Sequence, residues 1–475
     1  MITGSDHIGF PTLIQGGMGV AVSNWMLARA VAQKGQLGVV SGTALDTVFV
    51  RRLQDGDPGG HVRRAIEHFP VPHVGEDALK RYFLEGGRAP GQPYKMLPMY
   101  KQRVSVAREQ ITMLANFVEV FLAKEGHDGI VGVNLLTKVQ LPNLASLCGA
   151  MLAGVDYVLM GAGIPREIPG VLDAFADHRA ASIRFDVEGV EPAEPQYLTF
   201  DPQVHGVELD MPMKRPLFIA IVAASSLAAT LARKANGRVD GFVVEGPTAG
   251  GHNAPPRGEV RLNARGEPIY GERDIVDLAK MTALGVPFWI AGGAGSPKRL
   301  VEAVAAGATG VQVGTLFAYC DESGLADALK HEVLSRAAIG DVDIVTDPQA
   351  SPTGYPFKIV RWSDDDAAAH VRQRKCDLGY LRTAYRDTDG RIGYRCPAEP
   401  VDTYLKKGGV LADTEGRQCL CNGLTANIGQ PQIREDGFEE PPLLTSGDDL
   451  LSIQHYLGSR THYAASEVID YLLGD

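Results

Sequence analysis

The sequence lacks any long apolar run and contains few cysteines. No stretch of 18 or more apolar residues occurs in the chain of 475 residues, so no membrane-spanning helix is expected. The segment Met1–Asp6 has neither a basic region nor an apolar one, so we expect no signal peptide. Six cysteines are too few for a disulfide framework in a chain of this length. These absences together favour a cytoplasmic protein.

Basic residues are also in deficit. Lys and Arg number 46 against 57 Asp and Glu, which gives a formal net charge of −11. This balance disfavours nucleic acid as a partner, because nucleic-acid binding needs a basic surface. Apolar residues make up 45% of the chain, which is ample for a large core. The length exceeds one ordinary domain but suits a barrel with insertions.

Short apolar runs recur along the chain, and most are followed by a segment with helical spacing. Strands that alternate with helices indicate right-handed βαβ units and a parallel sheet. Eight such strands over about 320 residues predict an α/β fold of the (β/α)₈ TIM-barrel type. We predict helices over Trp25–Lys34, Leu144–Leu152, Leu227–Ala235, Ile275–Leu284 and Pro297–Ala306, and strands over Leu13–Gln15, Leu37–Ser41, Ile130–Asn134, Asp156–Met160, Leu217–Val222, Gly241–Glu245, Pro287–Ala291 and Gly310–Val313.

A doubly wound dinucleotide-binding sheet is the alternative architecture. Its best support is Gly17-Met18-Gly19, which supplies two glycines of the dinucleotide fingerprint. The third glycine is missing, and no acidic residue at the end of a second strand is placed to hold a ribose. The barrel is therefore favoured.

Two regions of the chain are not needed for eight plain βα repeats. We expect the barrel to occupy residues 1–345, with residues 45–129 inserted after its second strand. This insertion is too long for a βα loop and includes the amphipathic stretch Val104–Lys124, so we predict a helical lid over the mouth of the barrel. Residues 346–475 are predicted to form a C-terminal extension outside the barrel. It carries Cys376, Cys396, Cys419 and Cys421.

The segment from Val243 to His252 is the most informative part of the chain. An apolar strand runs into Glu245-Gly246-Pro247-Thr248-Ala249-Gly250-Gly251 and stops at a single histidine. Such an arrangement places a group that titrates near neutral pH where backbone approaches a ligand closely. The alternative is a histidine that only satisfies a glycine-rich turn.

Other predicted strands also end in small residues, at the edge where TIM barrels carry their active sites. The first strand leads into Gly16-Gly17-Met18-Gly19, the second ends in Ser41-Gly42-Thr43 and the third in Asn134. The loops that follow the last two strands contain Gly292–Gly293 and Gly314–Thr315, and such loops often bind phosphate through backbone amides. Glycines that merely relieve crowding in tight turns are the alternative.

The motifs Ile14-Gln15-Gly16-Gly17-Met18-Gly19, Gly132-Val133-Asn134, Ala249-Gly250-Gly251-His252, Ala291-Gly292-Gly293 and Gln312-Val313-Gly314-Thr315 occur in one order over most of residues 10–320. In this pattern the chain resembles the nitronate monooxygenase (2-nitropropane dioxygenase-like) superfamily, which consists of FMN-dependent (β/α)₈ barrels and includes flavin-type enoyl reductases. The tail segments around Cys376, Cys396 and Cys419–Leu424 are similar to those of the trans-acting enoyl reductases of polyketide and polyunsaturated-fatty-acid synthases, and so is the long insertion.

The resemblance implies FMN as the cofactor, with its phosphate on the last two loops, and His252 as the catalytic residue. It implies an enoyl reductase that uses NADPH or NADH to reduce enoyl thioesters held on an acyl-carrier protein of a synthase; a nitronate monooxygenase that consumes O₂ is the alternative. A third reading is a non-catalytic docking subunit, and a homodimer is one alternative for the oligomeric state. The expected cofactor-binding residues are Gln15, Gly16, Gly17, Met18, Gly19, Ser41, Gly42, Thr43, Asn134, Glu245, Gly250, Gly251, Gly292, Gly293, Gln312, Gly314 and Thr315.

The four cysteines of the tail are separated by 19, 22 and one residues, which is not a standard zinc-finger spacing. A four-thiolate zinc or iron–sulfur site and reduced structural thiols are the two alternatives. From the sequence alone we assign no metal ligand.

Overall fold

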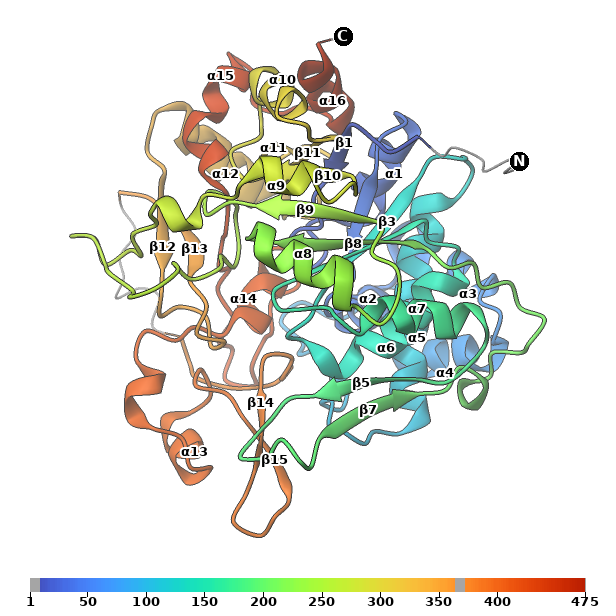
Figure 1. Ribbon diagram of the computed structural model, residues 1–475. Helices are drawn as coiled ribbons and strands as arrows, with labels where there is room; N and C mark the ends of the chain where they lie inside the picture. Colours follow the sequence, from blue (N-terminus) through green and yellow to red (C-terminus); the bar gives the residue numbers. More distant parts are fainter. Residues whose placement is uncertain (1–8, 364–371, 475) are drawn as a thin grey trace.

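The computed structural model describes residues 9–363 and 372–474, so the Met1–Asp6 segment lies outside the described residues. Eight parallel strands form one sheet in the order β1-β11-β10-β9-β8-β4-β3-β2. Its two outer strands meet, because Ile14 and Leu37 form a parallel bridge and the Gln15 amide donates to the Leu37 carbonyl at 3.0 Å. The predicted (β/α)₈ barrel is confirmed (Figure 1). The strands are β1 (Leu13–Gln15), β2 (Gly38–Ser41), β3 (Val131–Leu136), β4 (Tyr157–Gly161), β8 (Leu217–Val222), β9 (Gly241–Glu245), β10 (Phe288–Ala291) and β11 (Gly310–Val313).

The inside of the barrel is filled by apolar side chains from most of its strands. Trp289 is completely buried there, and its indole Nε1 donates to the Pro11 carbonyl at 2.8 Å, which satisfies the one polar atom of the ring. Strands covered on both faces read as continuous apolar runs, which is why the sequence predicts them well. The interior cluster consists of Ile14, Leu37, Val39, Tyr157, Leu159, Ile219, Val243, Trp289 and Ala291.

A ring of helices covers the barrel, and its last member comes from the C-terminal tail. Helix α16 packs against α10 and α1 (Figure 1). Val468, Ile469 and Leu472 of α16 are buried, and Lys34, the residue that follows α1, pairs with Asp470 at 3.1 Å. The tail therefore does not lie wholly outside the barrel, in contrast to the expectation from the sequence. The ring consists of α1 (Trp25–Gln33), α5 (Val106–Lys124), α6 (Gln140–Leu152), α7 (Ile168–Ala176), α8 (Ser225–Lys234), α9 (Leu278–Thr282), α10 (Pro297–Ala305) and α16 (Ala465–Leu473).

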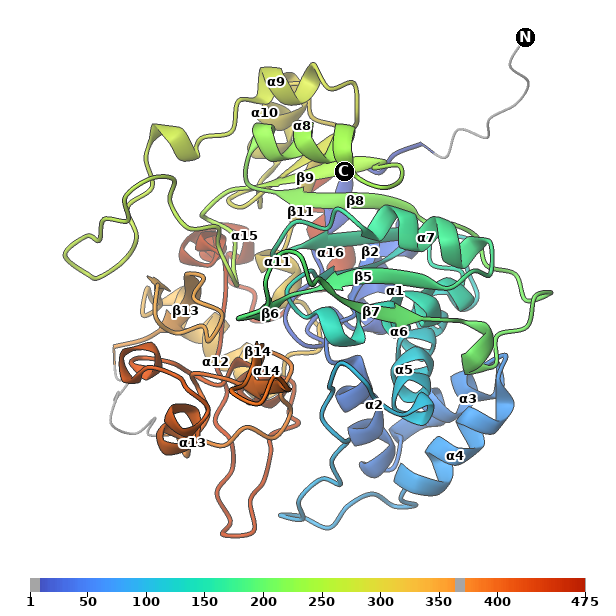
Figure 2. The same cartoon turned by 60° about the horizontal axis from the view of Figure 1, so that its bottom comes forward.

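The insertion after β2 also differs from the expected lid. Its longest helix, α5, contacts α1 and α6 and so takes the place of the second ring helix. Helices α2 (Leu45–Gln54), α3 (His61–Glu67) and α4 (Pro72–Tyr82) pack against α5 and against each other (Figure 2). Their apolar faces are thus covered within the insertion, and they do not need the rim of the barrel as a partner.

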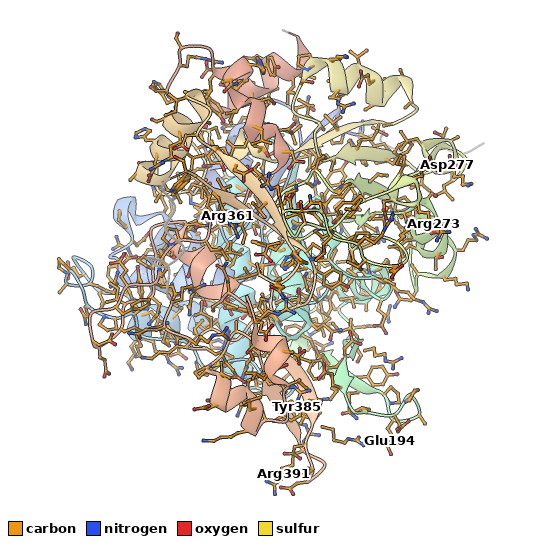
Figure 3. All side chains as sticks on the ribbon, turned by 90° about the vertical axis from the view of Figure 1, so that its left-hand side faces the viewer. Glu194, Arg273, Asp277, Arg361, Tyr385 and Arg391 are labelled. Atoms are coloured by element: carbon orange, nitrogen blue, oxygen red, sulfur yellow. The ribbon has the colours of Figure 1, made fainter. Side chains whose placement is uncertain are left out.

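The remaining strands, helices and turns belong neither to the barrel sheet nor to its ring of helices. Strands β5 (Ala181–Phe185) and β7 (Gln196–Phe200) pair with each other, and β6 (Val187–Glu188) pairs with β14 (Thr383–Arg386) of the tail. Figure 3 shows Tyr385 near Glu194, and the neighbouring Arg386 pairs with Glu194 at 2.9 Å. The described part of the chain contains no helix long and apolar enough to cross a membrane. Other elements are β12 (Asp343–Asp347), β13 (Phe357–Arg361), β15 (Ile392–Arg395), α11 (Thr315–Ala318), α12 (Asp327–Ala338), α13 (Val401–Lys406), α14 (Leu420–Ala426), α15 (Ile453–Leu457), and the 3₁₀ turns η1 (Pro58–Gly60), η2 (Gln203–His205), η3 (Glu272–Asp274), η4 (Leu411–Thr414) and η5 (Asp448–Ser452).

Candidate active site

One cavity opens at the carboxyl ends of the barrel strands. Its volume is about 260 Å³, whereas two further cavities in the described part of the chain measure about 10 Å³ each, so of these three it is the one with room for an organic cofactor. The structure brings nearly all of the predicted site residues together on its wall. These are Gly16, Gly17, Met18, Gly19, Ser41, Thr43, Asn134, Glu245, Gly250, Gly251, His252, Gly292, Gly293, Gln312, Gly314 and Thr315.

Gln15 and Gly42 are the two predicted cofactor residues that do not line the cavity. The Gln15 side chain is fully buried, donates to Ser23 Oγ at 2.8 Å and accepts from the Val39 amide at 3.0 Å. A Cβ atom at Gly42 would lie 2.7 Å from Leu135 Cδ2. Both residues therefore support the strand ends without facing the cavity.

The outer wall of the cavity comes from the tail. Tyr380 and the segment Thr445–Gly447 face the strand ends, and no residue of 45–129 takes part in the wall among the residues the structure describes. The sequence did not point to these tail residues, because they contact the barrel across long separations and follow no strand or helix period. Apolar members of this outer wall are Phe357, Leu381, Leu420 and Leu424.

The loops after β10 and β11 form a cradle of backbone groups. Gly292 and Gly293 have φ angles of +87° and +63°, a region that favours glycine. Thr315 Oγ1 accepts from the Gly447 amide at 3.2 Å, so the tail closes the cradle from one side. Asp449 Oδ2 accepts from the Gly295 amide at 3.1 Å, and burial raises the pKa of this carboxyl.

The donor and acceptor set fits FMN. Asn134 Oδ1 and Gln312 Oε1 are buried, belong to residues that line the cavity and have no partner among the described residues. Buried polar atoms are normally paired, so these atoms point to a ligand with polar edges such as an isoalloxazine ring. A Cβ atom at Gly314 would meet only Met18, with Sδ at 3.4 Å, which leaves the amides of this loop open for a phosphate.

His252 lies on the cavity wall directly after the β9 loop. Its Nε2 atom is 2.7 Å from Ser351 Oγ and 3.4 Å from Thr353 Oγ1, and its ring packs edge-on against Phe357. Burial, together with the charge of Lys138, lowers the pKa of His252 well below its usual value. The imidazole is therefore neutral at pH 7.

Two other titratable groups stand near His252. Burial raises the pKa of Glu245 to about 7, although the Lys138 cation opposes the shift. Burial also lowers the pKa of Lys138 to about 7, and its Nζ lies 4.5 Å from the centre of the Tyr355 ring. A carboxyl group on the cavity wall thus titrates at neutral pH, which is the property of a general acid or base.

Part of the chain matches a known protein family. Residues 195–358 match the model of the nitronate monooxygenase family. This part of the chain therefore resembles the nitronate monooxygenase family. The match supports the resemblance drawn from the sequence and the expected class of protein, an FMN-dependent oxidoreductase.

The individual proteins to which the chain is similar are distant relatives. A stretch of 117 residues is 33% identical to (3aS,4S,5R,7aS)-5-hydroxy-7a-methyl-1-oxo-octahydro-1H-indene-4-carboxyl-CoA dehydrogenase of Rhodococcus jostii (strain RHA1), and it spans 24% of this chain and 29% of that enzyme. FabK from Thermotoga maritima is 15% identical with a TM-score of 0.46, over 98% of this chain and 92% of its own. The enoyl reductase domain of MlnA from Bacillus amyloliquefaciens is 11% identical with a TM-score of 0.44, over 98% and 93%.

Proposed function

We propose that this protein is an enoyl-thioester reductase that uses FMN and NADPH or NADH, and that it acts in trans on substrates held by an acyl-carrier protein of a polyketide or fatty-acid synthase. The observation that carries this proposal is the apolar outer wall of the cavity. Phe357, Leu381 and Leu424 extend the wall beyond the glycine loops, which gives an acyl chain an apolar surface. A small nitronate needs no such extension.

The substrate class has a second support. The curated relative that shares 33% identity over 117 residues is named as a dehydrogenase of a carboxyl-CoA, which is a thioester. Oxidation and reduction next to a thioester carbonyl use the same hydride and proton positions in opposite directions. This favours thioester chemistry over nitronate oxidation.

The cradle and the polar wall would hold FMN in a defined orientation. The amides around Gly292, Gly293 and Thr315 are available for the phosphate, and Asn134 and Gln312 present buried polar atoms for the ring. When bound, FMN would carry the hydride of NADPH or NADH to the β-carbon of the unsaturated thioester. The chain must then provide a proton for the α-carbon and stabilise the charge on the thioester oxygen.

His252 is suited to the second of these tasks. A Ser351 hydroxyl that donates to Nε2 leaves Nδ1 as the N–H group of a neutral imidazole. A neutral imidazole donates a hydrogen bond to a developing oxyanion without first requiring a proton from solvent. We assign His252 this role, in place of the imidazolium acid that its ordinary pKa would suggest.

Glu245 is suited to the first task. Its pKa of about 7 keeps part of its carboxyl groups protonated at neutral pH, and the residue lines the same cavity as His252. A general acid works best when its pKa is close to the working pH. We therefore assign the α-carbon proton to Glu245, a residue that the sequence suggested only as a cofactor contact.

The proposed reaction is tested by stopped-flow flavin spectroscopy. The FMN-loaded protein is reduced with NADPH without oxygen and is then mixed with a crotonyl thioester of coenzyme A or of an acyl-carrier protein. We expect reoxidation of the flavin with one saturated thioester formed per flavin, and faster reoxidation by the carrier-bound form. Reoxidation by O₂ with nitronate consumption, and none by either thioester, would instead establish the monooxygenase alternative.

A further inference from the structure

Four cysteines of the tail converge on one place in the fold. Cys376 precedes β14, Cys396 follows β15, and Cys419 and Cys421 lie at the start of α14. Although 45 positions separate the first from the last in the sequence numbering, all four line a single small cavity of about 10 Å³. None of them forms a disulfide. The fold therefore gathers four free thiols around a common point.

Cationic side chains lie around the four thiols. Arg372 contributes a guanidinium group beside Cys419, and its Nη1 donates to the Cys419 carbonyl at 3.0 Å. Lys375 and Arg382 also line the small cavity.

The one carboxylate in this cavity is already neutralised. Glu399 pairs with Lys407 at 2.7 Å, and its other oxygen accepts from the Cys396 amide at 3.3 Å. It supports the chain next to Cys396 and does not compete as a ligand. The polar environment contrasts with that of Cys148 and Cys320, which are completely buried in the main apolar core.

A single bound ion does not suit this arrangement. No group of three or more His, Cys, Asp or Glu side chains is placed to hold one metal ion in residues 9–363 and 372–474. In an iron–sulfur cluster each thiolate binds its own iron atom, so the four sulfurs surround a centre larger than one ion. Four cysteines around a common point, with compensating cations and no tight single-ion geometry, match that requirement.

We propose that Cys376, Cys396, Cys419 and Cys421 together ligate an iron–sulfur cluster in the tail. This assignment departs from our expectation from the sequence, in which no metal ligand was assigned, and it does not depend on the proposed reductase reaction. The site also borders the flavin cavity, because Leu381, Leu420 and Cys421 line both cavities. The cluster and the flavin would share one wall.

The test uses the full-length protein purified without oxygen and assayed for iron, acid-labile sulfide, zinc and free thiols. We expect about two to four iron atoms and as many sulfides per chain, the composition of clusters held by four cysteines. We also expect a broad visible absorbance that remains after FMN is removed. One zinc per chain without sulfide, or four freely titrating thiols without metal, would overturn the proposal, and so would disulfides among the four.

Variants identify the ligands. Cys376→Ser, Cys396→Ser and Cys419→Ser should each lose most of the iron and sulfide, whereas Cys148→Ser, which alters a buried thiol elsewhere, should keep both. Unchanged iron and sulfide in all three tail variants would refute the assignment. Because a ligand variant can also fail to fold, the metal content of the unaltered protein remains decisive, and failure of the reductase assay would leave this result unchanged.

Discussion

Ser351 Oγ lies 2.7 Å from Nε2 of His252, so a residue of the tail orients the side chain that ends the β9 loop. Thr353 reinforces this contact, because its amide donates to Ser351 Oγ at 3.2 Å. The protonated nitrogen of the imidazole is therefore selected by residues about a hundred positions further along the chain. The tail is part of the active site and not an appendage to it.

Replacing His252 by alanine should separate the two halves of the reaction. Reduction of the flavin by NADPH should remain nearly unchanged, because hydride uptake does not use this side chain. Reoxidation by an enoyl thioester should slow by roughly 10²–10³-fold, the usual effect of losing one donor to an oxyanion. Stopped-flow absorbance measures both rates, and Ser351→Ala should show a smaller slowing of the same half-reaction. Equal slowing of both halves in His252→Ala would indicate a binding role instead.

The rate of reoxidation should depend on the protonation of Glu245. Its pKa is raised to about 7, so the protonated fraction, and with it the rate, falls as the pH rises through about 7. Glu245→Gln should abolish this limb of the pH profile and lower the rate by roughly 10²-fold or more. Single-turnover rates between pH 5.5 and 9 provide the measurement. A limb that survives in Glu245→Gln would assign the proton to another group.

Lys138 offers an independent check on the same limb. Its positive charge lowers the pKa of Glu245, so removing it in Lys138→Met should move the limb to higher pH. The direction is the informative result, since a general loss of activity would leave the midpoint in place. A shift toward lower pH would contradict the electrostatic coupling between the two residues.

Flavin retention should respond sharply to charge at Gly314. A Cβ atom there meets only Met18 Sδ, at 3.4 Å, so Gly314→Ala should keep FMN. Gly314→Asp adds a carboxylate next to the expected phosphate and should abolish FMN retention, because two anions repel in a partly buried site. The flavin absorbance per chain after desalting measures the difference. FMN retained at full occupancy by Gly314→Asp would place the phosphate elsewhere.

Helix α16 should contribute to the stability of the whole barrel. Ile469 is only 2% exposed, and Ile469→Ala should lower the free energy of unfolding by about 2–5 kcal/mol. Val301→Ala on α10 is the matched control, since Val301 is 68% exposed and its loss should change little. Denaturant unfolding followed by far-ultraviolet circular dichroism gives both values. Equal stability of the two variants would show that α16 is not part of the core.

The sequence predicted the barrel well because its signals are local. The strands Leu13–Gln15, Leu217–Val222, Gly241–Glu245 and Gly310–Val313 agree with the structure to the residue. Buried parallel strands produce continuous apolar runs, and each run ends at small residues that the turn requires. The same locality places the glycine loops and His252 on one cavity wall.

The contribution of the tail could not be predicted in this way. Ser351, Tyr380 and Gly447 reach the site through contacts across more than sixty positions, and no periodic pattern marks them. The amphipathic stretch Val104–Lys124 did predict helix α5 (Val106–Lys124), but amphipathicity does not reveal which apolar surface a helix will cover. The lid was therefore expected where the structure has a member of the ring.

The position of α16 has a consequence for any attempt to divide the chain. The residues between β11 and α16 form an insertion within the eighth βα repeat, and α16 supplies the helix of that repeat. A fragment that stops at residue 345 would leave the apolar flanks of α1 and α10 without cover, and such patches promote self-association. Domain-sized fragments should therefore be designed so that the final helix is retained, for example by an internal deletion that joins it directly to the end of α12 (Asp327–Ala338).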